Sequence, residues 1–584
     1  MGLVVQKFGG TSVADGERIL QVCRRINQAV SQGEQVVVVV SAMGKTTDSL
    51  IDLARSVAGE CPDPREMDLL LATGEQVTTA LVSMALQAQG QPAIGLTGRE
   101  AGIITEPHHQ RARIISIDVT RIKAELHQGK VVVVTGFQGI STTGEVTTLG
   151  RGGSDTSAVA LAAALLADRC EIYTDVPGIL TTDPRLVPQA SLLAEITAAE
   201  MLELASLGAK VLHPRAVEIA RNFAVPLVVR STWSEAPGTK ILSPAAPSGD
   251  LNSLEVNRLV DGIHIDRCQA KVALLGVPDR PGIAARLFSA LAEAGILVDL
   301  IVQAIQHPLN YNDIAFTVPR PDLDRALAVC RALHPSVTIL GDEQISIVSI
   351  SGVGIVGRPA IPARMFSALG QKDINIEMIS TSETKVSCVI AEGDSDRALA
   401  ALGEIFHLEP TPALLPAADA PTVRGVALDQ NQTRLAVLNV PDRPGVAARL
   451  LQSLADKGIP LDMIIQSEPA QGLNNIAFTI NSTDRYAAER TLQQTAQQLN
   501  CGEVLVDTEV AKLSIVGMGM AQAKGIAARM FQALAEQEIN IEMIATSEIK
   551  VSCIIRQRQA VIGLRAVHQA FGLDGSQVIP IERS

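Results

Sequence analysis

The chain has 584 residues, a net charge of −13, 47% hydrophobic residues and only 2% aromatic residues. This length predicts several domains, whose cores must be built from aliphatic side chains. The negative charge and the shortage of aromatic rings for base stacking argue against a nucleic-acid-binding protein, and no apolar stretch is expected to approach the length of a membrane span. The eight cysteines include no CxxC pair and no zinc spacing, which predicts reduced thiols in a cytoplasmic protein.

The first residues predict a strand, a glycine turn and a helix, at 3–8, 9–12 and 19–30. The backbone N–H groups of such a turn and the N-terminus of the helix that follows form a cradle for an anion such as a phosphate. Lys7 lies at the carboxyl end of the strand, where open α/β sheets bind their ligands. The glycine spacing is not that of a Walker loop, so this is not a P-loop enzyme. Taken alone, a lysine at this position would more often face solvent.

Two further strands, 36–40 and 131–134, consist entirely of valine. Such strands are typical of a parallel sheet that is covered on both faces. The first of them ends in a polar loop at 41–47, at the carboxyl edge of the same sheet. Residues 72–76 are predicted to open a further helix, in which Glu75 either complements the positive end of the helix dipole or binds a ligand.

A second glycine-rich loop, 148–155, leads into a segment of high helix propensity at 159–166. The glycines allow successive N–H groups to point at one spot, and the helix adds its positive end, so the loop is a second candidate anion cradle. Arg151 offers a planar fork for a carboxylate or phosphate, and Asp155 places a carboxylate beside it. The alternative is a glycine turn with an Arg–Asp pair on the surface.

The chain continues with a strand at 171–174 and a turn at 175–178, whose aspartate suits a ribose hydroxyl or an amide. Lys210 lies at a helix-to-loop junction, and 243–250 is a linker by composition. The alternation of strands and helices up to this linker predicts an α/β layered domain with a largely parallel sheet.

The second half of the chain is a duplication. Within each copy a weaker twofold repeat is present, so that each quarter is predicted to be a β-α-β-β-α-β ferredoxin-like unit. Such modules have exposed edge strands and tend to pair, which favours a homodimer. The repeated segments are 277–287 with 440–450, 314–317 with 476–479, 363–366 with 528–531, 374–379 with 539–544, and 385–388 with 550–553.

Four motifs in this order closely resemble those of the aspartate kinase family. They are KFGGTSV at 7–13, LGRGGSD at 149–155, YTDVPG at 173–178 and GAKVLHP at 208–214. The paired modules resemble ACT domains, the amino-acid-sensing units of that family. The resemblance covers essentially the whole chain, and the four-module tail is similar to the form found in some bacteria, cyanobacteria among them, where the usual enzyme has two modules.

The resemblance implies a three-layer amino acid kinase fold with a mainly parallel sheet, followed by four ferredoxin-like ACT modules. The boundaries that we expect are 1–243 for the catalytic domain, 244–259 for a linker, 260–343 for ACT module one, 344–408 for module two, 409–422 for a Pro-rich linker, 423–508 for module three and 509–584 for module four.

The implied activity is the ATP-dependent phosphorylation of the side-chain carboxylate of L-aspartate to 4-phospho-L-aspartate, the first step of lysine, threonine and methionine biosynthesis. Phosphoryl transfer needs mostly positioning and charge neutralisation. Mg²⁺ is expected to bind to the phosphates of ATP with few protein ligands, and we assign none. No general base is needed, because the attacking carboxylate is already ionised near neutral pH.

The resemblance also implies roles for individual residues. Lys7 and Asp155 are the expected catalytic residues: Lys7 neutralises the β- and γ-phosphates and Asp155 orients the groups around the transfer site. Arg151 would bind the α-carboxylate of aspartate, and Glu75 its ammonium group. The expected nucleotide-binding residues are Lys7, Phe8, Gly9, Gly10, Tyr173, Thr174, Asp175, Arg185 and Lys210. The expected substrate-binding residues are Ser41, Thr47, Glu75, Arg151, Gly152, Gly153 and Ser154.

The Asp-Arg-Pro-Gly segments at 279–282 and 442–445 place free N–H groups at helix starts, which suits the carboxylate of an effector. A plain turn before a helix would explain the proline and the glycine, but not why both copies keep all four residues. The family's effectors are lysine and threonine, with a coupling to catalysis of about 1–3 kcal/mol. The expected allosteric residues are Asp279, Gly282, Ile283, Ala284, Gln303, Asn375, Ile376, Asp442, Gly445, Val446, Ala447, Gln466, Asn540 and Ile541.

Two other functions are compatible with the motifs. One is a kinase of the same fold that acts on glutamate, N-acetylglutamate or a nucleoside monophosphate. The other is a non-catalytic amino-acid sensor, against which the retention of Lys7, Glu75, Arg151 and Asp155 argues. The sequence leaves open which effector binds which pair of modules.

Overall fold

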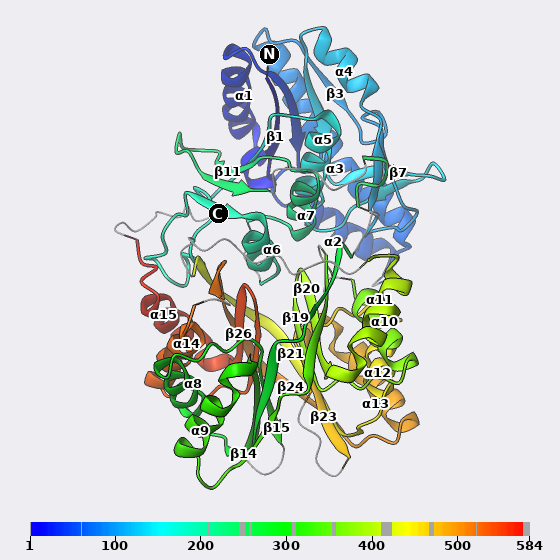
Figure 1. Ribbon diagram of the computed structural model, residues 1–584. Coiled ribbons are helices and arrows are strands. Elements are labelled where there is room, and N and C mark those ends of the chain that lie inside the picture. Colours follow the sequence, from blue (N-terminus) through cyan, green and yellow to red (C-terminus); the bar gives the residue numbers. More distant parts are fainter. Residues whose placement is uncertain are drawn as a thin grey trace. The chain divides into compact units, whose positions relative to one another are not determined.

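The computed structural model divides into two compact units, which are described separately (Figure 1). The first unit contains residues 2–180 and 191–255, and the second contains 181–190 and 260–575. The residues that the structure describes are 2–59, 61–207, 211–243, 251–255, 260–306, 311–352, 355, 358–409, 423–466, 472–520 and 523–575.

The first unit is built on an eight-stranded sheet, parallel throughout except where β11 and β12 pair antiparallel. Its central strands are buried on both faces, since every residue of Val36–Val40 is at most 1% exposed. The prediction of a mainly parallel sheet is thus confirmed. The strand order is β10 (Glu195–Thr197), β12 (Thr239–Leu242), β11 (Leu227–Ser231), β9 (Arg169–Thr174), β1 (Leu3–Phe8), β2 (Gln35–Val40), β6 (Val131–Thr135) and β3 (Ala93–Leu96).

Helices cover both faces of this sheet and make the three layers that were predicted (Figure 1). Alternate residues of β1, such as Val4 and Phe8, share a core with α1 (Gly16–Ser31) and α3 (Pro64–Ala88), whereas α5 (Gly153–Leu165) packs on the sheet from the other side. The remaining elements of the unit are α2 (Thr46–Ala58), α4 (Thr120–His127), α6 (Ala198–Ser206), α7 (Pro214–Asn222) and a small sheet in the order β5 (Ile114–Ile117), β4 (Ile103–Thr105), β7 (Gln138–Ser141) and β8 (Val146–Thr148).

Helix α3 corrects two expectations. It begins at Pro64, so Glu75 lies in its middle and does not open a helix. It is also long and apolar enough to cross a membrane by length and composition, contrary to the sequence analysis, but half of its most apolar window is buried inside the unit. The buried Asp68 accepts a hydrogen bond from the backbone N–H of Thr148 at 3.0 Å. These are the properties of a core helix.

In the second unit, modules one and three have the predicted β-α-β-β-α-β order. Module one consists of β14 (Gln269–Pro278), α8 (Ile283–Glu293), β15 (Ile301–Gln306), β16 (Tyr311–Pro319), α9 (Leu323–Leu333) and β17 (Thr338–Asp342). Module three consists of the second half of β21 (Gly425–Pro441), α12 (Val446–Ala455), β22 (Ile464–Gln466), β23 (Leu473–Asn481), α13 (Arg485–Gln498) and the first half of β24 (Val504–Val516).

Modules two and four take one strand each from upstream in the chain. Strand β13 (Gly262–Asp266) pairs antiparallel with residues 347–351 of module two, and residues 425–429 pair with the end of β24 in module four. The predicted boundaries at 260 and 423 therefore assign these strands to the wrong modules. The other elements are β18 (Ile345–Ser351), α10 (Ala360–Gln371), β19 (Met378–Ser382), β20 (Lys385–Ala391) and α11 (Ser395–Phe406) in module two, and α14 (Ile526–Glu536), β25 (Met543–Ser547), β26 (Lys550–Arg556) and α15 (Ala560–Ala570) in module four.

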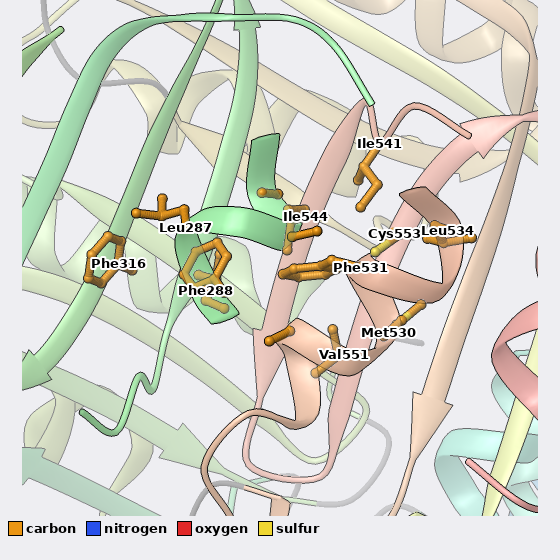
Figure 2. Packing of buried hydrophobic residues seen from close by; sticks show 14 of the residues in the cluster. Leu287, Phe288, Phe316, Met530, Phe531, Leu534, Ile541, Ile544, Val551 and Cys553 are labelled. Carbon is orange, nitrogen blue, oxygen red and sulfur yellow. The ribbon is translucent and has the colours of Figure 1, made fainter. Parts of the chain in front are cut away.

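The modules pair as one with four and as two with three. Strands β15 and β25 pair antiparallel and join modules one and four edge to edge. The helices of this pair share a core in which Phe288 contacts Phe316 and Phe531 edge to face, each with ring centroids 5.5 Å apart (Figure 2). Modules two and three share a second core. A third core lies on the opposite sheet faces, where Ala273, Met378 and other apolar residues of all four modules meet.

A short segment from the N-terminal half of the chain, 181–190, belongs to the second unit. The carbonyl of Thr181 accepts a hydrogen bond from the N–H of Val426 at 2.8 Å, and its hydroxyl lies 2.8 Å from Nε2 of the buried His568. Val187 is buried in the core of modules one and four. The chain that follows the turn at 175–178 is therefore anchored in the second unit.

Candidate active site and effector pockets

Lys7 and Asp155, the two expected catalytic residues, form an ion pair with each other. Lys7 comes from the carboxyl end of β1 and Asp155 from the first turn of α5, and Nζ lies 2.6 Å from Oδ1, with both side chains about nine-tenths buried. Gly152 caps α5 in the left-handed region, with φ 69°. A Cβ on Gly152 would lie 2.3 Å from the ring of His213, so only glycine brings the loop to this position.

The first glycine loop lies against the ends of the neighbouring strands. The N–H of Gly9 donates to the carbonyl of Tyr173 at 3.4 Å, and a Cβ on Gly10 would lie 2.9 Å from the carbonyl oxygen of Ala42. Phe8 and Tyr173 stack at 4.7 Å in the core and are at most 3% exposed. If these two residues take part in nucleotide binding, as predicted, they do so through their backbone.

Glu75 is a buried carboxylate beside this loop. Its Oε1 accepts a hydrogen bond from the N–H of Ala42 at 3.1 Å, and its Oε2 has no partner among the described residues. Burial raises the pKa of Glu75 to about 7, because a charged carboxylate is costly away from water. A cationic ligand would reverse this cost. Ser41 adjoins the loop, its N–H donating to the carbonyl of Phe8 at 3.1 Å, and Thr47 lies in the first turn of α2.

Arg151 and Gly152 are exposed at the turn before α5, and the Gly153 and Ser154 that follow are buried. Within the described part of the chain, no carboxylate pairs with Arg151. Among the described residues, a guanidinium without an ion-pair partner therefore lies at the start of the helix that carries Asp155. The alternative interpretation of this loop, a surface pair between Arg151 and Asp155, does not hold, since Asp155 pairs with Lys7.

The predicted nucleotide-binding loops are only partly brought together. The hydroxyl of Thr174 donates to Asp175 at 3.0 Å, and Asp175 is exposed. Arg185 forms an ion pair with Asp183 at 2.7 Å and lies in the segment that belongs to the second unit. Lys210 lies outside the described residues.

One supporting residue was missed. Arg215 is mostly buried, donates to the carbonyl of Leu149 in the glycine loop, and forms an ion pair with Glu255 at 2.7 Å. It follows the recognisable His213-Pro motif directly, so its position was a usable signal. Glu255 fell in the segment that was assigned as a linker, and no local pattern marked it as a partner.

Each Asp-Arg-Pro-Gly segment contributes to a pocket between two modules. Pocket I joins modules one and four: Oδ1 of Asp279 accepts hydrogen bonds from the amides of Asn540 at 2.7 Å and Asn312 at 2.9 Å. Pocket II joins modules three and two, and Asp442 accepts in the same way from Asn375 at 3.2 Å and Asn474 at 3.3 Å. The predicted residues Asp279, Gly282, Ile283, Ala284, Gln303, Asn540 and Ile541 line pocket I, and Asn375, Ile376, Asp442, Gly445, Ala447 and Gln466 line pocket II.

Val446 is the predicted allosteric residue that does not line its pocket, because it packs against the core of modules two and three. Asn312 and Asn474 were missed, although both stand two residues before the repeated Ile-Ala-Phe-Thr. The side-chain oxygens of Asn312, Asn474, Gln303 and Gln466 have no hydrogen-bond partner among the described residues. Each pocket thus presents a carboxylate and two free amide oxygens, which suits an ammonium group.

Residues 2–231 match the amino acid kinase family, and ACT domains match at 272–334, 348–406, 438–495 and 513–571. The aspartate kinase of Stutzerimonas stutzeri is 48% identical over 412 residues, 70% of this chain and 98% of its own length. Aspartokinase 2 of Bacillus subtilis is 47% identical over 416 residues, 71% of this chain and 100% of its own. The crystal structure of aspartate kinase from Synechocystis covers 100% of both chains at 52% identity, with a TM-score of 0.86. The chain belongs to the aspartate kinase family.

Proposed function

We propose that the protein catalyses the ATP-dependent phosphorylation of the side-chain carboxylate of L-aspartate, the first step of lysine, threonine and methionine biosynthesis. The observation that carries this proposal is the position of the Lys7–Asp155 pair, 2.6 Å apart, where two glycine loops converge at one edge of the sheet. Lys7 provides positive charge for the terminal phosphates, and the loop N–H groups provide donors.

The transfer needs little covalent chemistry from the protein. The aspartate carboxylate is ionised at neutral pH and attacks the γ-phosphorus directly. Lys7 offsets the charge that builds up on the transferred group, and Asp155 holds the lysine ammonium in place through their ion pair. Asp155 also offers carboxylate oxygens, the ligand type that Mg²⁺ prefers, so the residues present fit a metal that binds mainly to the phosphates of ATP.

Two side chains of opposite charge would bind the α-carboxylate and the α-ammonium group of the substrate. Arg151, which pairs with no carboxylate of the described chain, binds the α-carboxylate. Glu75 binds the ammonium group, and its Oε2 is available for this contact. A substrate without an α-amino group would leave Glu75 buried and unpaired, which disfavours acceptors other than an amino acid.

Pockets I and II would bind the end products lysine and threonine and inhibit the kinase. The N–H groups at the starts of α8 and α12 suit the effector's carboxylate, and Asp279 and Asp442 suit its ammonium group. The anchoring of 181–190 in the regulatory unit gives a covalent route from these modules to the loop at 175–178. The homodimer and the cytoplasmic localisation stay predictions.

The test is an assay with ATP, Mg²⁺ and aspartate, in which hydroxylamine traps the acyl phosphate as a hydroxamate. We expect hydroxamate with aspartate and much less with glutamate or N-acetylglutamate. A nucleoside monophosphate forms no acyl phosphate, so it is tested by ADP release, which we expect to be absent. Lys7→Ala should lower hydroxamate formation about 10²–10³-fold or more, while Lys123→Ala, at an exposed lysine on α4, should leave it unchanged. Absence of aspartyl hydroxamate from the folded, ATP-binding protein would contradict the proposal.

A further inference from the structure

An ion pair begins two residues after Asn375 in pocket II and two residues after Asn540 in pocket I, and each ends on the strand that leads to the other pocket. We propose that these two ion pairs couple pockets I and II, so that an amino acid bound in one changes the affinity of the other. The inference rests on the proposed effector function of the pockets and adds a route between them.

The first bridge runs from pocket II to pocket I. Asn375 donates to Asp442 in pocket II, and two residues later Glu377 accepts from Nζ of Lys271 at 2.5 Å. Lys271 lies on β14, the strand that ends one residue before Asp279 of pocket I. The lysine side chain is 10% exposed and the glutamate 23%, so solvent screens this pair only in part.

The second bridge runs from pocket I to pocket II. Asn540 donates to Asp279 in pocket I, and two residues later Glu542 accepts from Nη1 of Arg434 at 2.8 Å. Arg434 lies on β21, which ends one residue before Asp442 of pocket II. The side chains of Arg434 and Glu542 are 9% and 5% exposed, which makes this the more buried bridge.

The second bridge is also reinforced. Arg434 contacts Asp507 at 2.9 Å, and Arg556 contacts Asp507 at 2.9 Å and Glu542 at 2.5 Å. The four side chains form a closed ring of alternating charge between modules three and four. Because the second bridge is the more buried of the two, we assign the larger share of the coupling to it.

Ligand binding would act directly on the segments that position these two ion pairs. An effector ammonium competes with Asn540 for Oδ1 of Asp279, so binding in pocket I displaces the asparagine or draws it closer. Glu542 lies on the same short segment and must follow, and its buried ion pair transmits the shift to Arg434 and β21. The same sequence of contacts runs from Asp442 through Asn375 and Glu377 to Lys271. Coupling between sites is reciprocal by thermodynamic necessity.

The experiment is isothermal titration of the full-length protein with lysine, alone and at saturating threonine, and the reverse. Asp279→Ala and Asp442→Ala assign each ligand to a pocket. We expect the second ligand to bind at least about fivefold differently in the presence of the first. The double variants Arg434→Met/Glu542→Gln and Lys271→Met/Glu377→Gln remove both charges of a bridge, which avoids an orphaned buried charge.

In each double variant the affinity for a single ligand should stay within about twofold, and the coupling factor should fall towards one, more for the Arg434 pair. The conservative Lys271→Arg should keep the coupling. The matched control is Lys385→Met/Glu548→Gln, a more exposed ion pair between modules two and four that follows no pocket asparagine; it should leave the coupling unchanged.

The outcomes separate this inference from the proposed effector function. If the wild-type protein binds neither lysine nor threonine, the effector function fails and the inference fails with it. If the wild-type protein binds both ligands independently, the inference alone is overturned. The same holds if both bridge variants still bind each ligand alone and keep the coupling.

Discussion

The candidate active site and pockets I and II both combine a glycine turn at a helix start with a carboxylate, yet they use charge differently. In the kinase unit, Asp155 forms an ion pair with Lys7 at 2.6 Å. In the regulatory unit, Asp279 is held by two neutral amides at 2.7 and 2.9 Å. A fixed positive charge suits a phosphate that must be stabilised during transfer, whereas neutral amides can be exchanged for a ligand's ammonium at small cost. The proposed catalytic site thus pairs its carboxylate with a fixed cation, whereas the proposed effector pocket pairs its carboxylate with neutral amides that a ligand can replace.

Among the variants that test this difference in the use of charge, we expect Lys7→Ala to have the largest effect. Removal of the ammonium leaves Asp155 buried without a partner and the phosphates without a counter-charge, so kcat should fall about 10²–10³-fold or more. Hydroxamate formation measures the loss. Titration should show that lysine and threonine still bind, because the pockets lie in the other unit. A variant with near-normal kcat would remove the catalytic role of the pair.

Asp279→Asn and Asp442→Asn test whether the carboxylates of pockets I and II bind the ammonium group of an effector. Each substitution keeps the shape and removes the charge, so the effector's ammonium loses a charge-assisted hydrogen bond. This is a loss of about 1.5–3 kcal/mol, or about 10- to 100-fold in the inhibition constant of the amino acid bound there. Initial rates without effector should not change. Equal inhibition of the wild type and both variants would show that neither carboxylate reads an effector.

The pH dependence of aspartate use should follow Glu75, whose pKa burial raises to about 7. Below this pH the carboxyl is neutral and cannot pair with the substrate ammonium. The kcat/KM for aspartate should therefore decrease as the pH is lowered, by up to about tenfold per pH unit. Glu75→Gln should lower kcat/KM at pH 8 and remove this slope. An unchanged profile in the variant would assign the ionisation to another group.

The same residue gives a stability prediction of definite sign. Between its ordinary pKa of 4.5 and about 7, the folded protein holds a proton on Glu75 that the unfolded chain has lost. Stability should therefore decrease as pH rises through this window. Urea unfolding of the wild type and Glu75→Gln at several pH values checks this, and the difference between them should grow towards pH 7.

The smallest effect that we expect concerns the helix residue that lies against the glycine turn of each pocket. Where module four has Ala535, module two has Gly370, and a Cβ on Gly370 would lie 2.8 Å from Cα of Gly445 in pocket II. Gly370→Ala should push the loop away and weaken binding in pocket II by about 1 kcal/mol, or about fivefold. Ala535→Gly is the matched change at pocket I and should alter binding there less. Titration of each variant measures both pockets.

Local patterns determined much of this protein. The all-valine strands, such as 36–40, predict a doubly covered parallel sheet because no polar face is left for water. The two glycine loops predict the anion cradles, and the repeated segments from 277 onwards predict four modules. Each of these signals is carried by neighbouring residues, so it can be read without knowledge of the fold.

Only the tertiary structure decided which strands the modules exchange and which distant groups meet. Residues 262–266 and 425–429 carry no local signal that assigns them to one module rather than another, and in the structure they pair with strands of modules two and four. The anchoring of 181–190 and the bridge from Arg434 to Glu542 likewise join residues far apart in the chain. Strand pairing and ion pairs depend on spatial neighbours, and a single sequence encodes those only through the complete fold.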